Sequence, residues 1–128
     1  MGPHVSAIFQ AICKQPRMYV QDASYAAVSA FIYGYDLALD GGPLVGFWEW
    51  LIVREMEETN LPWWLLLRRQ VHEDTDLSTV PTVEQDRELV AALGAALKSY
   101  GDARGAHGLD RIYYEYHCWR HALQESSA

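Results

Sequence analysis

Hydrophobic residues recur at helical spacing through most of this chain, and most densely between Ser24 and Leu39. In that stretch the apolar side chains return every three or four positions, which places them on one face of an α-helix: Tyr25, Val28, Ile32, Tyr35 and Leu39. Further apolar residues widen this face, so we expect helix 24–39 to be central, with neighbours on several sides. Asp22 or Ser24 can cap its first turn, and Gly41-Gly42 can end it.

The same periodicity predicts further helices, at 4–14, 43–58, 82–100 and 109–123. Thr82 and Gln85 form a capping-box pattern at the start of the third of these. Between the helices we expect a short extended link at 17–20, a polar loop at 72–81 and a flexible link at 101–108. The run WWLLLRRQV at 63–71 fits either a helix or a buried strand, and its Leu, Arg and Gln content favours a helix.

These elements predict an all-α fold. We expect a single irregular bundle of about five or six helices around helix 24–39, forming one domain over residues 1–128. A chain of 128 residues is long enough to bury a core of this kind without disulfides or metals.

The charge of the chain is strongly negative and unevenly distributed. The formal net charge is −7, which argues against nucleic acid as a ligand because binding to phosphates depends on Lys and Arg. Between Glu49 and Glu88 there are ten acidic residues against four basic ones. An acidic middle segment can attract a basic partner, or it can simply form a solvated surface.

The sequence carries no predicted export or membrane segment. The N-terminus lacks a basic region followed by an apolar run, and the longest apolar runs are interrupted by Gly, Arg or Glu. The two cysteines, Cys13 and Cys118, are too few for a disulfide-rich secreted scaffold. We therefore expect a cytoplasmic protein that does not associate with membranes.

Three segments, QPRMYV, SAFIYGYDLAL and GFWEWLIVR, carry a resemblance to a group of small bacterial proteins. The chain resembles actinomycete-type proteins that read RPGMYVG, then a helix with a GY element, then GFxEW followed by a turn and a tryptophan. The match covers Pro16 to Trp64, and Arg17 and Gln21 replace the glycines of that pattern. The resemblance implies an all-helical fold and no catalytic residues, and some of these proteins occur near toxin and immunity loci.

Trp63 and Trp64 are the strongest candidates for a protein-binding site. Adjacent residues on a helix point about 100° apart, so we do not expect both rings to be buried. Acidic residues flank the pair on both sides in the sequence: Glu55, Glu57, Glu58, Glu73, Asp74 and Asp76. An exposed tryptophan with a charged rim is typical of a protein-binding hot spot, although one ring could pack inward and the other over its own domain.

A second set of polar and aromatic residues suggests a pocket instead. These residues are the polar and aromatic members of the segments that carry the resemblance: Arg17, Tyr19, Tyr35, Asp36, Trp48, Glu49 and Trp50. They could line an aromatic pocket with acid and base groups. A polar residue within an apolar pattern is more often a structural hydrogen-bond partner, for example Glu49 accepting from Arg17.

His117 and His121 form a weak candidate for a metal site. They lie four residues apart on a predicted helix, so both imidazoles project from one face, and Glu125 extends the row. Such pairs are common on helices and lack the specificity of an HExxH or CxxC motif. We expect neither a resident metal nor a cofactor.

The sequence favours a non-enzymatic protein-binding module, most concretely an immunity-type inhibitor that covers a basic toxin. The alternative is a small-molecule-binding or catalytic domain with an aromatic-lined pocket. A homo-oligomer, in which a second copy covers an apolar face, is a third possibility.

Overall fold

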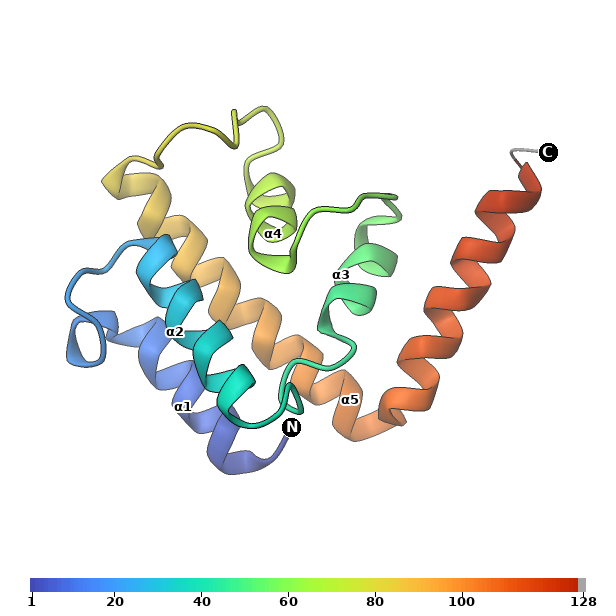
Figure 1. Ribbon diagram of the computed structural model, residues 1–128, viewed down its shortest axis with the longest axis horizontal. Coiled ribbons are helices and arrows are strands. Elements are labelled where there is room, and N and C mark those ends of the chain that lie inside the picture. Colours follow the sequence, from blue (N-terminus) through green and yellow to red (C-terminus); the bar gives the residue numbers. More distant parts are fainter. Residues whose placement is uncertain (127–128) are drawn as a thin grey trace.

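A computed structural model describes residues 1–126 of the chain (Figure 1). Five α-helices and one 3₁₀ segment make up this part, with no β-strand among the residues described: α1 (Pro3–Lys14), η1 (Pro16–Met18), α2 (Tyr25–Ala38), α3 (Phe47–Glu55), α4 (Trp63–Val71) and α5 (Val83–Ser126). The predicted all-α fold class is confirmed. The segment at 63–71 is helical, as its composition favoured over a strand.

The helix that packs against all the others is α5, which runs behind them in Figure 1. The predicted central helix, α2, packs mainly against α5 and α1 and meets α4 only at Trp64, whose carbonyl accepts from the Tyr25 hydroxyl at 2.7 Å. The buried side chains of the first half of α5 supply much of the core: Leu89, Val90, Leu93, Ala96, Leu97 and Tyr100. In α2, Leu39 lies just beyond the end of the helix and is 45% exposed, although Tyr25, Val28 and Ile32 are buried as expected.

The ends of α2 are fixed by side-chain hydrogen bonds. The Ser24 hydroxyl accepts from the backbone N–H of Ala27, as expected for an N-cap. The Asp86 carboxylate on α5 accepts from the Tyr25 N–H at 2.9 Å, which joins the first turns of α2 and α5. Thr82 and Gln85 exchange the two hydrogen bonds of the predicted capping box at the start of α5.

The connection from α2 to α3 is longer than predicted, because α3 begins at Phe47 rather than at residue 43. Residues 39–46 form turns that α5 holds in place: the Tyr100 hydroxyl donates to the Val45 carbonyl, and Arg104 donates to the carbonyls of Gly42 and Pro43. Gly46 immediately before the helix has a φ of +83°, a conformation that favours glycine.

α5 is bent at a single residue. The predicted flexible link at 101–108 is helical up to Gly108, where φ is +80° and ψ is 164°, and the helix then resumes in a new direction (Figure 1). The second half packs along α3: Ile112 is buried, and the ring centroids of Tyr116 and Trp48 lie 5.8 Å apart.

Two shorter segments also differ from expectation. The predicted extended link at 17–20 begins instead with the 3₁₀ segment η1, where Tyr19 and Val20 donate backbone hydrogen bonds to Pro16. The helix predicted to reach residue 58 ends at Glu55, because Met56 adopts a left-handed conformation. Among the described residues, no helix combines the length and apolar character needed to cross a membrane.

Candidate functional site

The last turn of α4 holds an unusual buried charge. Arg68 is only 5% exposed, and its guanidinium donates to three backbone carbonyls of the following loop, those of Asp76, Leu77 and Thr79, at 3.4, 3.3 and 2.9 Å. A buried charge is costly unless hydrogen bonds replace its hydration, and these carbonyls supply them. Arg68 therefore fixes the course of the loop.

The loop after α4 is further ordered by its own side chains. Asp76 accepts from both the backbone N–H and the hydroxyl of Ser78, at 2.9 and 2.7 Å, which is the Asx-type pattern common in turns. These hydrogen bonds hold the pKa of the Asp76 carboxyl below its usual range. The loop presents Glu73, Asp74 and Asp76 as exposed carboxylates.

Arg69, the next residue of α4, holds the other acidic loop. Its guanidinium lies 2.7 Å from the Glu57 carboxylate, in the segment between α3 and α4. Adjacent arginines therefore bring both acidic loops to the same end of α4. We call the resulting surface the acidic edge: Glu57, Glu58, Glu73, Asp74 and Asp76.

The sixth predicted acid, Glu55, stays in the last turn of α3, with its carboxylate 3.8 Å from Arg54. Because α3 ends there, Glu57 and Glu58 lie outside the helix and are not part of its partially negative C-terminal turn.

The two tryptophans do not both reach the surface. Trp63 is 8% exposed and packs edge-on against Phe47, with ring centroids 5.7 Å apart. Trp64 is half-buried and meets the exposed ring of Tyr33 at 5.1 Å. Its remaining surface lines a hollow of about 260 Å³ with Ala26, Ser29, Ala30 and Tyr33 of α2, which we call the apolar hollow.

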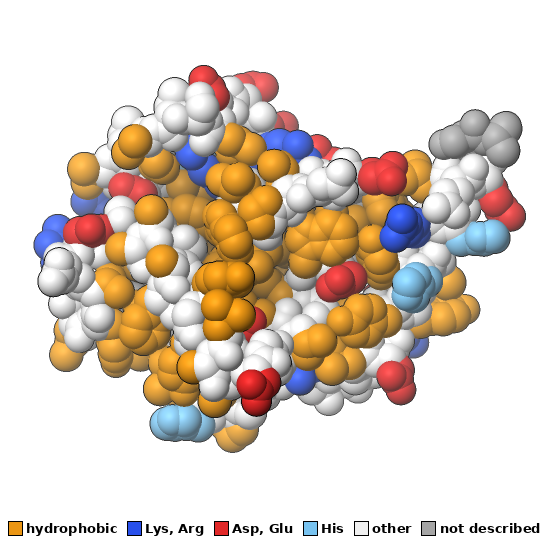
Figure 2. Space-filling view, in the orientation of Figure 1, with side chains coloured by type: hydrophobic (Ala, Val, Ile, Leu, Met, Phe, Trp, Pro, Cys, Tyr) orange, Lys and Arg blue, Asp and Glu red, His pale blue; other side chains and the backbone are white. Residues whose placement is uncertain are grey.

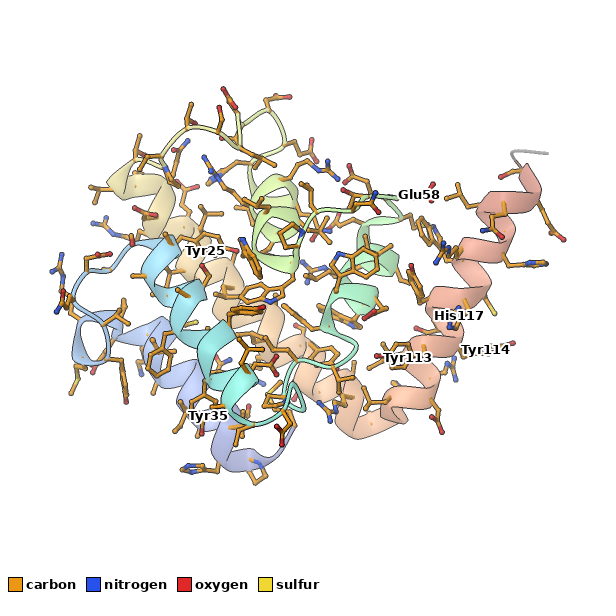
Figure 3. All side chains as sticks on the ribbon, in the orientation of Figure 1. Tyr25, Tyr35, Glu58, Tyr113, Tyr114 and His117 are labelled. Carbon is orange, nitrogen blue, oxygen red and sulfur yellow. The ribbon has the colours of Figure 1, made fainter. Side chains whose placement is uncertain are left out.

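The acidic edge therefore lies beside the accessible tryptophan, Trp64, and does not surround both tryptophans. Trp64 lies in the first turn of α4 and the arginine anchors lie in its last turn, a separation of roughly 6–8 Å along the helix axis. Figure 2 shows hydrophobic side chains gathered in the middle of this face and acidic side chains along its upper margin. Glu58 is labelled on that margin, in the loop after α3, in Figure 3.

The predicted aromatic pocket is not assembled. Tyr19 and Tyr35 both pack on Phe31, with centroids at 6.2 and 6.3 Å, and form a row along α2. Arg17 lies in η1, away from Glu49, and no hydrogen bond or ion pair joins these two described residues.

The remaining members of the pocket set are used in local structure. Asp36 is buried and accepts from the Leu44 N–H at 2.8 Å, which ties the turn after α2 to that helix. The Trp48 indole donates to the Leu61 carbonyl at 2.7 Å, and Trp50 lies under the Arg54 guanidinium at 4.8 Å. Partial burial raises the pKa of the Tyr113 hydroxyl, and the charge of Glu49 raises it further. These residues act as separate structural partners and not as one site.

His117 and His121 both lie exposed on the second half of α5. His121 contacts Glu125 at 3.1 Å, and His117 contacts the ring of Tyr116. Within residues 1–126 there is no group of three or more His, Cys, Asp or Glu side chains placed to hold a metal ion.

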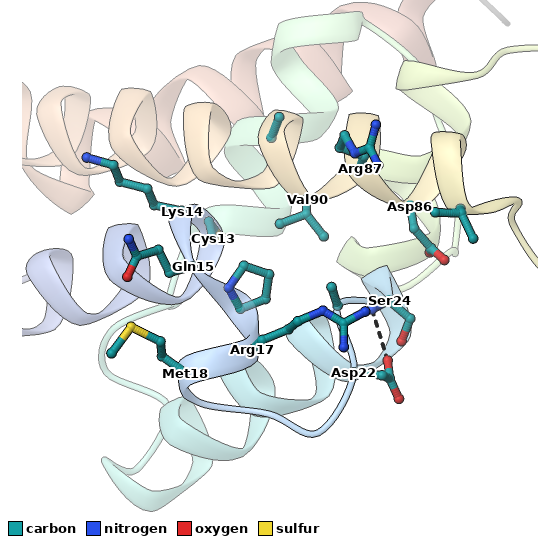
Figure 4. Close-up of a pocket in the computed structure, with 14 residues that line it drawn as sticks. Cys13, Lys14, Gln15, Arg17, Met18, Asp22, Ser24, Asp86, Arg87 and Val90 are labelled. Carbon is teal, nitrogen blue, oxygen red and sulfur yellow. Dashed lines mark hydrogen bonds between the residues drawn. The ribbon is translucent and has the colours of Figure 1, made fainter.

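Sequence reasoning missed a hollow of about 1030 Å³ between the end of α1, η1, the approach to α2 and the first turns of α5 (Figure 4). We call it the basic hollow because Lys14, Arg17 and Arg87 line it. These residues come from three separate segments, so no local sequence pattern links them. Burial raises the pKa of the Cys13 thiol in its wall to about 12, which keeps the thiol protonated.

Comparison of the chain with protein-family models, with curated proteins and with solved structures gives no match.

Proposed function

We propose that this chain is a non-enzymatic binding protein whose partner is a basic protein. The observation that carries the proposal is the pair of adjacent arginines, Arg68 and Arg69, which hold two acidic loops together beside the accessible Trp64. Carboxylates held in place before association can attract a cationic partner without the cost of ordering the loops first.

Most carboxylates of the acidic edge are available to a partner. Among the described residues, Glu58, Glu73 and Asp74 are exposed and have no cation within ion-pair distance. Only Glu57 is neutralised, by Arg69. A basic partner would therefore meet uncompensated negative charge from both loops, in a chain that already carries a net charge of −7.

The apolar hollow supplies the second part of the proposed interface. The rings of Trp64 and Tyr33 stand beside small residues of α2, Ala26 and Ala30, so an apolar side chain of the partner can enter between them. Aromatic residues in such positions commonly dominate the dissociation rate of a complex. The most concrete form of the proposal is a cytoplasmic immunity-type inhibitor that covers a basic toxin.

The first test requires a purified partner, sought among the products of neighbouring genes, and measures association and dissociation rates across a salt series. Glu58→Lys with Asp74→Lys should slow association about tenfold at low ionic strength, and much less at high salt, because exposed charges are screened. The charge-matched control is Asp102→Lys with Asp110→Lys, exposed residues of α5 near its bend, far from the acidic edge in Figure 1. An equal effect of both variants would contradict a role for the acidic edge.

Trp64→Ala should instead accelerate dissociation, by a factor corresponding to ~2 kcal/mol or more, with little change in the association rate. Tyr19→Ala is the control, because Tyr19 is also an accessible aromatic residue but packs on Phe31 and lines no part of the apolar hollow. Melting temperatures of both variants separate lost binding from lost folding. Unchanged dissociation in a folded Trp64→Ala variant would exclude the apolar hollow from the interface.

A further inference from the structure

The basic hollow lies apart from the acidic edge and gathers positive charge in an acidic protein. Lys14, Arg17 and Arg87 are three of the ten lysines and arginines of the chain. Within residues 1–126, neither Lys14 nor Arg17 has a carboxylate within ion-pair distance, and Arg87 reaches only Glu84, at 4.0 Å between two highly exposed side chains. Figure 4 shows Arg17 extending across the hollow from η1 toward the start of α2.

The two carboxylates in the wall of the hollow are already engaged by backbone groups. Asp22 accepts from the Ser24 N–H and Asp86 accepts from the Tyr25 N–H, both at 2.9 Å. Both hydrogen bonds come from backbone N–H groups at the start of α2. Together with the Ser24 hydroxyl, the two carboxylates therefore pair N–H groups that have no partner within the helix. Both carboxylates keep their charge, and Asp22 also attracts Arg17, so the wall sets three positive charges against two negative ones and stays positive on balance.

Much of the rest of the wall is apolar, and two of its apolar side chains are unusually exposed. Met18 and Val83 are 73% and 75% exposed, and both line the hollow, together with Pro16, Val90 and Ala91. Large apolar side chains that remain exposed beside cations form a surface suited to a ligand with both an apolar part and a negative charge.

Two common catalytic groups, an imidazole and a reactive thiol, are missing from the wall. It contains no histidine, and its one thiol, Cys13, stays protonated and therefore a poor nucleophile at neutral pH.

We propose that the basic hollow binds a small amphiphilic organic anion, a carboxylate or phosphate attached to an apolar body. Arg17 binds the charged group, since a guanidinium pairs well with carboxylate and phosphate oxygens, and Lys14 and Arg87 add long-range attraction. The apolar body lies against Met18, Val83 and Val90. Such a ligand bridges η1 and α5 and stabilises the fold by binding only the folded state.

The test uses octanoate and octyl phosphate as anionic probes, with octylammonium as a probe of the same chain length and opposite charge. Because the protein carries a net charge of −7, non-specific attraction favours octylammonium. A local basic site is therefore indicated if the anions raise the melting temperature and octylammonium does not. The stronger of the two anions identifies the preferred charged group. Acetate and inorganic phosphate, which lack the apolar body, should have little effect at the same concentration.

The location of the site is tested by variants and by amide chemical shifts. The double variant Arg17→Gln with Arg87→Gln should weaken anion binding about tenfold or more, since charge-assisted hydrogen bonds are lost. The matched control is Arg111→Gln with Arg120→Gln, two exposed arginines on the second half of α5. Ala91→Trp should also block binding, by filling the hollow without changing its charge.

In the wild-type protein, the probe should shift amide resonances of residues 13–18, 22–24 and 83–91. The proposal is overturned if neither anion binds at millimolar concentration, if octylammonium binds equally well, if the shifted resonances lie elsewhere, or if the two double variants lose binding equally.

Discussion

Gly46 is a single residue on which the joint between α2, α3 and α5 depends. Its φ of +83° is unfavourable for residues with a side chain, and a Cβ there would lie 3.1 Å from both the Leu109 side chain and the Tyr100 hydroxyl. We expect Gly46→Ala to lower the free energy of unfolding by about 2 kcal/mol or more, as measured by urea denaturation.

Gly34→Ala is the matched control for this prediction. Gly34 lies in the middle of α2 with open space where the Cβ would be. The substitution should stabilise the protein by about 0.5–1 kcal/mol, because alanine has the better helix propensity. If both substitutions had the same sign, the strained conformation of Gly46 would not be the controlling factor.

Single residues of the candidate sites could be predicted only in part. The acidic residues can be read from the sequence. Helix geometry also predicts that the adjacent Trp63 and Trp64 are not both fully buried. The periodicity of apolar residues does not indicate which group each side chain contacts in the folded protein. Arg68 reaches loop carbonyls up to eleven positions away, and Arg17 and Arg87 line one hollow although seventy positions separate them. Such groupings follow from tertiary packing and leave no local pattern.

At the scale of elements, Gly108 decides the direction of the second half of α5. Its combination of φ +80° and ψ 164° is accessible to glycine almost alone. Gly108→Ala should therefore destabilise the protein by about 1–3 kcal/mol, or straighten α5 and remove Ile112 and Tyr116 from α3. Urea denaturation followed by tryptophan fluorescence would detect both results, because Trp48 and Trp119 contact Tyr116.

Gly105→Ala, three residues earlier in α5, provides the comparison. Gly105 is helical, and a Cβ there would meet nothing within 4 Å. It should leave stability unchanged or raise it slightly. Loss of stability in both variants would mean that helix propensity around residues 101–108, and not the bend, controls this region.

Most of the helices could be predicted from the sequence, but where they end and which one is central in the packing could not. α1, α2 and the first half of α5 have buried residues at spacings of three and four, which is the signal that periodicity detects. In the second half of α5 only Ile112 is buried, and partly buried Leu109, Tyr116 and Trp119 continue the spacing. Gly101, Gly105 and Gly108 suggested a loop, yet packing of Tyr100 and Ile112 on either side outweighs their poor propensity. The central position of α5 depends on which helix faces pack against one another. The apolar character of α2 does not indicate that packing.

At the scale of the whole molecule, buried acidic groups set the stability at high pH. Burial raises the pKa of the Cys13 thiol from 9.0 to about 12 and that of the Tyr100 hydroxyl from 10.0 to about 12, and it also raises the pKa of Tyr25. A raised pKa in the folded state means that the folded protein holds its proton more tightly than the unfolded chain. The stabilisation is complete below pH 9 and is lost as the pH rises toward 12.

We therefore expect the urea midpoint to be nearly constant from pH 7 to 9 and to fall steeply from pH 9.5 to 11. Cys13→Ala should reduce the first part of this fall, because the thiol titrates at the lowest pH in the unfolded chain. Cys118→Ala, which removes the exposed cysteine, serves as the control. A Cys13→Ala profile parallel to that of the wild-type protein would show that the thiol is not responsible.

The position of α5 in the chain has a consequence for biosynthesis. All four preceding helices pack on α5, yet α5 is made after them. At a synthesis rate of about 5–20 residues per second, roughly 2–8 s pass between completion of α4 and emergence of Ile112. During that interval the preceding helices lack all or part of the α5 surface on which they pack, so their apolar side chains are accessible to chaperones. The nascent chain thus completes its core late and nearly all at once. Premature termination within α5 would therefore yield an aggregation-prone, protease-sensitive fragment instead of a smaller folded protein.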